Sequence, residues 1–124
     1  MPFEATLKFH LAAVQNRRLD DLVSTLADDV VVLFPNGRKM AGKETVAEFH
    51  KKWFADQSWT LTPTVERIST GRDQSFALIK YAYSDDQPET RTNWLVLVFR
   101  LRDGKWLLVH DQNTRVAPPP PTAP

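Results

Sequence analysis

The sequence predicts a single α+β domain in which helices pack on one face of a curved antiparallel sheet. In the first half of the chain, apolar residues recur at intervals of three and four, which is typical of amphipathic helices. After about residue 56 the apolar period shortens to two, which is typical of strands. Helices followed by a run of strands is the element order of an α+β fold.

Length and composition limit the class of protein. The chain has 124 residues, of which 42% are hydrophobic and 25% charged, so one folded domain is expected. Sixteen basic and fifteen acidic residues leave a net charge of +1, which argues against an electrostatic nucleic-acid binder. There is no cysteine, no long apolar run and no leader pattern. We therefore expect a cytoplasmic protein without disulfides or membrane contact.

Three helices are expected in the first part of the chain. The first covers about residues 3–14, with Phe3, Leu7, His10, Leu11 and Val14 on its apolar side. The second covers residues 19–27, with Leu22, Val23 and Leu26 as its buried side chains. The third covers residues 43–55 and has the strongest periodicity. Its apolar stripe comprises Val46, Phe49, His50, Trp53 and Phe54.

Strands make up most of the remaining chain. They are expected at residues 30–34, 38–40, 60–69, 76–84, 91–102 and 105–115. Pro35-Asn36-Gly37 predicts a turn between the first two strands, and Asp103-Gly104 predicts a tight hairpin between the last two. The domain is expected to span residues 1–116. The proline-rich residues 117–124 are expected to form an extended or disordered tail.

The last hairpin indicates self-association. Neither residues 94–99 nor residues 106–109 alternate apolar with polar side chains, so both faces of this hairpin favour burial. The helices can cover only one face. We expect the outer face to meet a second copy in a two-fold dimer. The alternatives are a monomer with an apolar outer face and a sheet covered by the proline-rich tail.

Two histidines and one lysine interrupt apolar patterns. His10 and His50 lie on the core stripes of different helices, where a histidine is either a structural or a functional group. Lys80 lies in the middle of a hydrophobic strand, and it points either outward, with its stem along the surface, or into the concave face as a fixed positive charge.

The last strand carries two polar sets. Val109, Asp111 and Asn113 share one face, and His110 and Gln112 share the other. Strand parity alone leaves open which set faces the helices. No spacing typical of metal ligands occurs, and neither does a nucleotide-binding or nucleophile motif. The sequence therefore predicts no metal and no cofactor.

Several strings in their order resemble the SnoaL-like, ketosteroid-isomerase-like branch of the nuclear transport factor 2-like superfamily. They are Leu19-Asp20-Asp21-Leu22, Leu26-Ala27-Asp28-Asp29-Val30, Pro35-x-Gly37, Ala41-Gly42-Lys43 and the segment from Asp103 to Asp111. The resemblance covers about residues 3–116. It implies a cystatin-like cone, with the sheet wrapped around three helices, a ligand cavity between them and dimerisation through the sheet.

The same resemblance argues against steroid isomerisation. Aligned through Ala27-Asp28-Asp29 and Pro35, the catalytic base of the steroid isomerases falls on Phe34. Their oxyanion-hole tyrosine falls on His10, and their buried aspartate falls near Leu97. A carbon-acid isomerase needs a base and donors for the enolate, and phenylalanine and leucine supply neither.

A second resemblance is to the association (hub) domain of the calcium/calmodulin-dependent kinases. It involves Phe49-His50-Lys51-Lys52-Trp53-Phe54, Ile79-Lys80 and the segment from Gly104 to His110. In those hubs the matching histidine, with an arginine at the place of Lys80, lines a pocket for small carboxylates. Together the two resemblances turn Lys80, Val109, Asp111 and Asn113 inward and place His110 on the dimer side.

We therefore expect a homodimeric cone with a small-molecule pocket, and two kinds of function remain open. The expected lining comprises His10, Phe34, Phe49, His50, Trp53, Lys80, Asn93, Asp111 and Asn113. In the first hypothesis the protein is an acid–base enzyme on a small, partly apolar molecule, with Asp111 as base and His10 or His50 as donor. In the second it is a non-catalytic binding or assembly domain that holds an anionic ligand through Lys80 and His50. Lys80 and Asp111 are as readily expected to form a structural pair.

Overall fold

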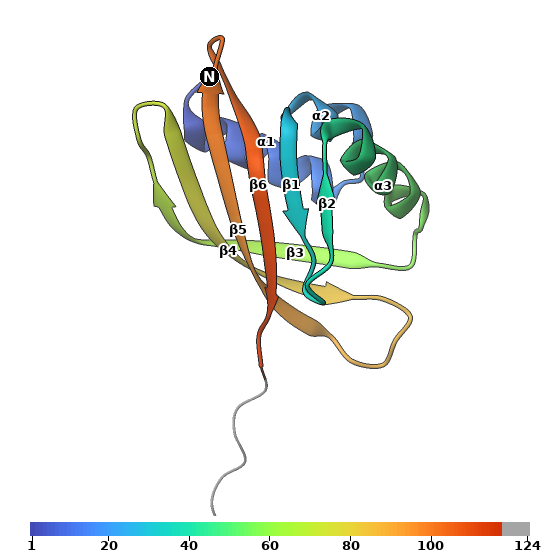
Figure 1. Ribbon diagram of the computed structural model, residues 1–124. Helices are drawn as coiled ribbons and strands as arrows, with labels where there is room; N and C mark the ends of the chain where they lie inside the picture. The colour runs from blue at the N-terminus through green and yellow to red at the C-terminus, as the bar shows by residue number, and fades with distance from the viewer. Residues whose placement is uncertain (118–124) are drawn as a thin grey trace, which may run out of the picture.

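The computed structural model describes residues 1–117, which form helices and strands in the order typical of the expected α+β class. The helices are α1 (Phe3–Gln15), α2 (Leu19–Ser24) and α3 (Lys43–Ala55). The strands are β1 (Leu26–Leu33), β2 (Lys39–Ala41), β3 (Thr60–Ser69), β4 (Gln74–Ser84), β5 (Arg91–Arg102) and β6 (Lys105–Arg115). The helices lie together on one side of a curved sheet (Figure 1). The predicted α+β cone is confirmed.

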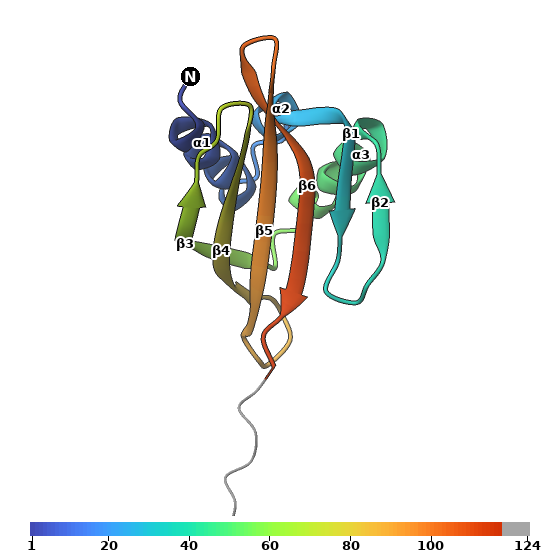
Figure 2. The ribbon, with the colours of Figure 1, turned by 60° about the vertical axis from the view of Figure 1, so that its left-hand side comes forward.

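The six strands form one sheet in the order β2-β1-β6-β5-β4-β3 (Figure 2). All neighbouring pairs are antiparallel except β1 and β6, which run parallel. The predicted hairpin at Asp103-Gly104 is present. Both residues have positive φ, 51° and 77°, as a two-residue turn between twisted strands requires.

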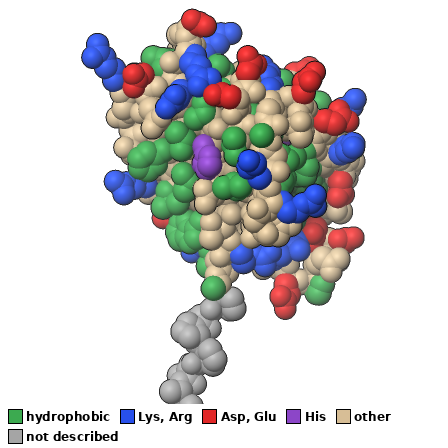
Figure 3. Space-filling view, viewed as in Figure 1, with side chains coloured by type: hydrophobic (Ala, Val, Ile, Leu, Met, Phe, Trp, Pro, Cys, Tyr) green, Lys and Arg blue, Asp and Glu red, His purple; other side chains and the backbone are tan. Residues whose placement is uncertain are grey.

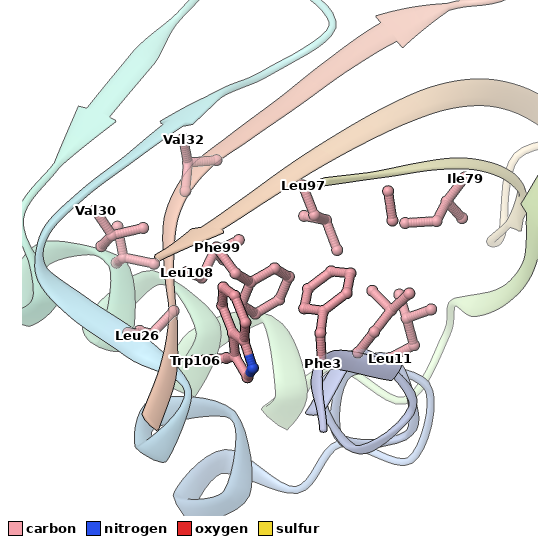
Figure 4. Packing of buried hydrophobic residues seen from close by; sticks show 13 residues of the cluster. Phe3, Leu11, Leu26, Val30, Val32, Ile79, Leu97, Phe99, Trp106 and Leu108 are labelled. Carbon is pink, nitrogen blue, oxygen red and sulfur yellow. The ribbon is translucent and has the colours of Figure 1, made fainter. Parts of the chain in front are cut away.

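The main core lies between α1 and the concave face of the sheet. Phe3 of α1 packs edge-on against Phe99 and Trp106, at ring-centroid distances of 5.3 Å and 5.5 Å. Figure 4 shows these rings meeting the side chains of Leu97 and Leu108 from the sheet. A second cluster surrounds the buried Trp59 at the α3 side. Burial of these side chains, at roughly 1.5–3 kcal/mol each, holds the helices on the sheet.

The second helix is shorter than predicted. It ends at Ser24, and Leu26 and Ala27 already belong to β1. Leu26 lies opposite Leu108 of β6, and the Leu108 N–H donates to the Thr25 carbonyl at 2.7 Å. Pairing with β6 satisfies this backbone as a strand, which the local apolar spacing does not reveal.

Two further observations concern the chain as a whole. None of the helices in residues 1–117 has the length and apolar character needed to cross a membrane. Apart from Ala117, the predicted proline-rich tail lies outside the described residues.

The convex face of the sheet carries many apolar side chains. Leu78, Trp94, Val96 and Val98 alternate with the buried residues of β4 and β5 and are only partly covered. Figure 3 shows hydrophobic side chains gathered over the strands, around a histidine. The helices cover the opposite face, as predicted.

Candidate functional site

A cavity of about 280 Å³ lies between the concave face of the sheet and helices α1 and α3. Strands β3 to β6 form one wall, α1 and α3 form the other, and the end of β1 closes one side. Most of the lining is apolar, with a few polar groups among it, as is usual in sites for small organic molecules.

Most residues expected at the pocket line this cavity. They are His10, Phe34, Phe49, His50, Trp53, Asn93, Asp111 and Asn113. Their location agrees with the sequence-based expectation, whereas their roles in binding or catalysis stay predictions.

Lys80 is the exception, and its inward placement was wrong. On β4, Ile79 and Tyr81 are buried on the concave face, so the intervening Lys80 points to the convex face. There it lies opposite Trp94, with its ammonium nitrogen 5.1 Å from the centre of the Trp94 ring. Lys80 therefore neither pairs with Asp111 nor contributes positive charge to the cavity.

A β-bulge brings Asp111 into the cavity. Along β5 and β6, Val98 pairs with His110 and Phe99 pairs with Leu108, which leaves Val109 without a partner. The extra residue reverses the strand parity. Leu108 before it and Asp111 after it both face the helices, so the expectation that Val109 shares the face of Asp111 was wrong.

Asparagine 113 holds the Asp111 carboxyl group in place. The Asn113 amide donates to Asp111 Oδ1 at 2.8 Å and to the Leu33 carbonyl at 2.8 Å. Its own oxygen accepts from the Tyr81 hydroxyl at 2.7 Å. In the described part of the chain, Asp111 Oδ2 has no hydrogen-bond partner. One oxygen is thus fixed and the other is available to a ligand.

Removal from bulk water is the main influence on the acidity of these groups. Burial raises the pKa of Asp111 to about 7, against the smaller lowering effects of Asn113 and His110. Burial also raises the pKa of Tyr81 to about 12. Near neutral pH, Asp111 can therefore both accept and release a proton, whereas Tyr81 keeps its proton.

The two cavity histidines have defined proton positions. The Thr25 hydroxyl donates to the Leu22 carbonyl at 2.6 Å, so it accepts from His10 Nδ1 at 2.7 Å. His50 Nδ1 lies 2.7 Å from the Val46 carbonyl, which can only accept. Both rings therefore carry the proton on Nδ1.

Burial keeps both histidine rings uncharged. It is the main cause that lowers the pKa of His10 to about 3, and it also lowers the pKa of His50. A neutral ring with its proton on Nδ1 has a lone pair on Nε2. In this state each ring offers an acceptor to the cavity, and the expected role of His10 or His50 as a proton donor or anion ligand stays a prediction.

An aromatic wall faces the sheet across the cavity. Phe49 meets Phe34 at a ring-centroid distance of 5.0 Å, and Trp53 stacks on Trp59 at 4.1 Å. The Arg17 guanidinium covers the other side of Trp59, 3.8 Å from its ring. These contacts fix the shape of the apolar wall.

Sequence reasoning missed four polar residues of the lining. They are Tyr81, Tyr83, Arg91 and Arg115. The sequence signal for both tyrosines was the apolar pair Ala77 and Ile79. Residues of the same parity on a strand share one face, and the structure buries that face. The arginines lie near strand ends, where parity gives no such guide.

Arg91 lines the cavity where the end of β4 meets the start of β5. It forms an ion pair with Asp85 and lies 5.1 Å from the centre of the Tyr83 ring. Its Nε is buried and has no hydrogen-bond partner among the described residues. Arg115 donates to Asn93 Oδ1 at 3.1 Å. Arg115 therefore adds positive charge to this end of the cavity, whereas Asp85 offsets the charge of Arg91.

The side chains of residues 1–117 offer no group of three or more His, Asp or Glu placed to hold a metal ion. The proton donors and acceptors that the cavity presents include the Asp111 carboxyl, the two imidazoles and the amides of Asn93 and Asn113.

Comparison with known proteins agrees with this architecture. Residues 8–109 match the sequence profile of the SnoaL-like domain. No curated protein matches the chain.

Solved structures share the fold at low sequence identity. One is a candidate calcium/calmodulin-dependent protein kinase type II association domain from Thiobacillus denitrificans (TM-score 0.78, 20% identity, 93% of this chain and 95% of that one). Another is a candidate dehydratase of the NTF2-like family from Streptomyces avermitilis (TM-score 0.79, 13% identity, 93% and 94%). A third is an LEH-like epoxide hydrolase from M. tuberculosis (TM-score 0.71, 18% identity, 90% and 80%). At these identities the likeness shows the fold alone.

Proposed function

Because the chain belongs to the SnoaL-like family and places a buried carboxyl group in its cavity, we propose that it is an acid–base enzyme acting on a small, partly apolar organic molecule. Asp111 is the proton-transferring residue. The observation that carries the proposal is the hydrogen bonding of this carboxyl group. Asn113 donates to its Oδ1, whereas its Oδ2 has no partner among the described residues.

The acidity of Asp111 suits this role. A general base works best when its pKa lies near the operating pH, and burial raises the pKa of Asp111 to about 7. At neutral pH a large fraction of the molecules carries the carboxylate. That form takes a proton from the substrate or from a water molecule beside it, and the protonated form returns the proton.

The apolar wall supplies substrate binding. Phe34, Phe49 and Trp53 offer flat surfaces to a ring or a short hydrocarbon chain. A substrate bound between these rings and the sheet displaces water, which strengthens hydrogen bonds to the reacting group. Substrates with one or two rings suit a cavity of about 280 Å³.

Two structural neighbours, the candidate dehydratase and the epoxide hydrolase, suggest reactions to test, since dehydration and epoxide hydrolysis both need a base. In dehydration of a β-hydroxy ketone, the Asp111 carboxylate removes the proton next to the carbonyl group. The β C–O bond then breaks, and the protonated Asp111 returns the proton to the departing hydroxyl, which leaves as water. In epoxide hydrolysis, Asp111 removes a proton from the attacking water while an epoxide C–O bond breaks, and the resulting alkoxide then takes the proton back from Asp111.

The test uses two compounds, 4-hydroxy-4-phenylbutan-2-one and styrene oxide, with product followed by chromatography. We expect turnover of at least one compound, with a rate that rises with pH around 7. Asp111→Asn should reduce that rate about 100-fold or more. The matched control, Asp20→Asn on the exposed side of α2, should leave it unchanged.

Turnover that does not depend on Asp111, or no turnover of either compound, contradicts the proposal. Retained binding without any turnover favours the alternative, a non-catalytic binding or assembly domain. One structural neighbour, the candidate kinase association domain, supports that alternative. The convex position of Lys80 removes the cation on which its anion-binding form relied, which leaves Arg91 and Arg115 as the basic side chains of the lining.

The outer sheet face supports a proposal about assembly. Leu78, Trp94, Val96 and Val98 form a partly exposed apolar surface on the neighbouring strands β4 and β5. A surface of this kind on a sheet favours a two-fold pairing with a second copy. The cavity opens on the opposite side, so each subunit keeps its own site.

A further inference from the structure

Two ring nitrogens at the cavity, Nε2 of His10 and Nε2 of His50, are hydrogen-bond acceptors without a partner in the described part of the chain. His10 and His50 come from different helices, yet both use Nδ1–H for a protein contact. In each ring the Nε2 lone pair therefore remains, and neither Nε2 has a hydrogen-bond partner among residues 1–117. Both rings line the cavity, and neither Nε2 is a fully buried atom, so each is reachable by a molecule in the cavity. A molecule that fills this end of the cavity satisfies them only by donating a hydrogen bond.

We propose that the substrate carries a hydroxyl group at its buried end, and that this group donates its hydrogen bond to Nε2 of His10 or His50. The inference rests on the proposed function and deepens it, because it names the substrate class of the same site. That class is a small apolar alcohol or phenol. A carboxylate is disfavoured there, since its oxygens and the imidazole nitrogens would present lone pairs to one another.

The neighbouring rings hold the two imidazoles in these orientations. His10 packs edge-on against Phe99 at a centroid distance of 5.7 Å. His50 packs edge-on against Phe49 and Phe54, at 5.3 Å and 5.6 Å. Rotation of either ring would break its Nδ1 hydrogen bond, so the acceptor position is set before a ligand arrives.

Charge selects a neutral donor over a cationic one. Arg115 and Arg91, the latter paired with Asp85, line the same cavity, and their guanidinium groups disfavour a further cation there. An ammonium group also loses more hydration than a hydroxyl when it enters an apolar site. An alcohol or phenol meets the acceptor requirement without either cost.

The proton positions are testable without any substrate. Long-range ¹H–¹⁵N NMR of the full chain distinguishes a protonated ring nitrogen from a bare one. At pH 7 we expect His10 and His50 to show a protonated Nδ1 and a bare Nε2. His110, on the convex face, is the internal comparison. A proton on Nε2 of both His10 and His50 overturns the inference.

The ligand preference is tested with four probes that share a 4-ethylphenyl group: 4-ethylphenol, 4-ethylanisole, 4-ethylbenzoate and 4-ethylbenzylamine. Calorimetry should show 4-ethylphenol binding about tenfold more tightly than 4-ethylanisole, which has no O–H to donate. On binding, the Nε2 resonance of His10 or His50 should shift. Equal or tighter binding of the benzoate or the benzylamine overturns the inference.

Variants identify the acceptors. His10→Phe and His50→Phe remove an acceptor and keep a ring, and together they should abolish the preference for the phenol. His110→Phe makes the same change on the convex face and should keep it. If the phenol preference holds while Asp111→Asn changes no turnover, the proposed enzyme fails and the inference stands. If turnover depends on Asp111 but 4-ethylphenol and 4-ethylanisole bind equally well, the proposed enzyme stands and the inference about the hydroxyl group fails.

Discussion

Leu108 and Asp111 both face the interior although they are three positions apart on one strand. The bulge at Val109 makes this possible, because one extra residue reverses the alternation of side chains. Before the bulge, β6 supplies the apolar core. After it, the same strand supplies the polar groups of the cavity.

Deletion of Val109 should therefore cost far more stability than its truncation. Without the bulge, either Leu108 or Asp111 and Asn113 must leave the interior. Loss of a buried leucine alone costs about 2–5 kcal/mol. We expect urea unfolding to show a loss of that order for the deletion and a smaller one for Val109→Ala, which keeps the bulge. Equal losses would contradict the role given to the bulge.

Stability should depend on pH through Asp111. Burial raises the pKa of its carboxyl group to about 7, whereas the unfolded chain ionises near 3.8. Between these values the folded state binds more protons, so the free energy of unfolding falls as pH rises. Asn at this position does not titrate. The stability of Asp111→Asn relative to the wild type should therefore rise between pH 4 and 7, by on the order of 3 kcal/mol.

Chemical denaturation of both proteins at half-unit pH intervals measures this difference. His110 and Asn113 act on Asp111 in the folded state and are unchanged in the variant. A difference that stays constant from pH 4 to 7 would show that Asp111 titrates normally.

The two buried histidines should produce the opposite slope. Burial, with a further effect of His50, lowers the pKa of His10 to about 3, and burial lowers that of His50 as well. As pH falls below 6.5 the unfolded chain takes up protons that the folded chain excludes, so stability is lost. In an Asp111→Asn background, adding His10→Phe and His50→Phe should flatten this loss between pH 6.5 and 4. An unchanged slope would mean that the rings are charged in the folded protein.

The proposed dimer should depend on the convex face. Val96 lies beside Leu78 in the centre of that surface. Val96→Glu places a charge there and should shift the mass measured by light scattering from that of two chains to one, with little effect on the melting temperature. Thr62→Glu, exposed on the edge strand β3, is the control. A wild-type chain that is already monomeric excludes the proposal.

Local patterns in the sequence determined most of the fold. Helical spacing located α1 and α3, segments rich in β-branched and other apolar residues located β3 to β6, and Asp103-Gly104 defined the hairpin. These features depend on backbone conformation and on the side of an element that is apolar, both of which neighbouring residues encode.

Tertiary structure decided the content of the cavity. Strand parity places residues on two faces, but only packing against the helices selects the buried one. That selection turned Lys80 outward and, through the bulge, turned Asp111 inward. The proton positions of His10 and His50 likewise depend on how each ring meets the Thr25 hydroxyl and the Val46 carbonyl. Hydrogen bonds and burial arise between segments distant in the chain, so local spacing carries no record of them.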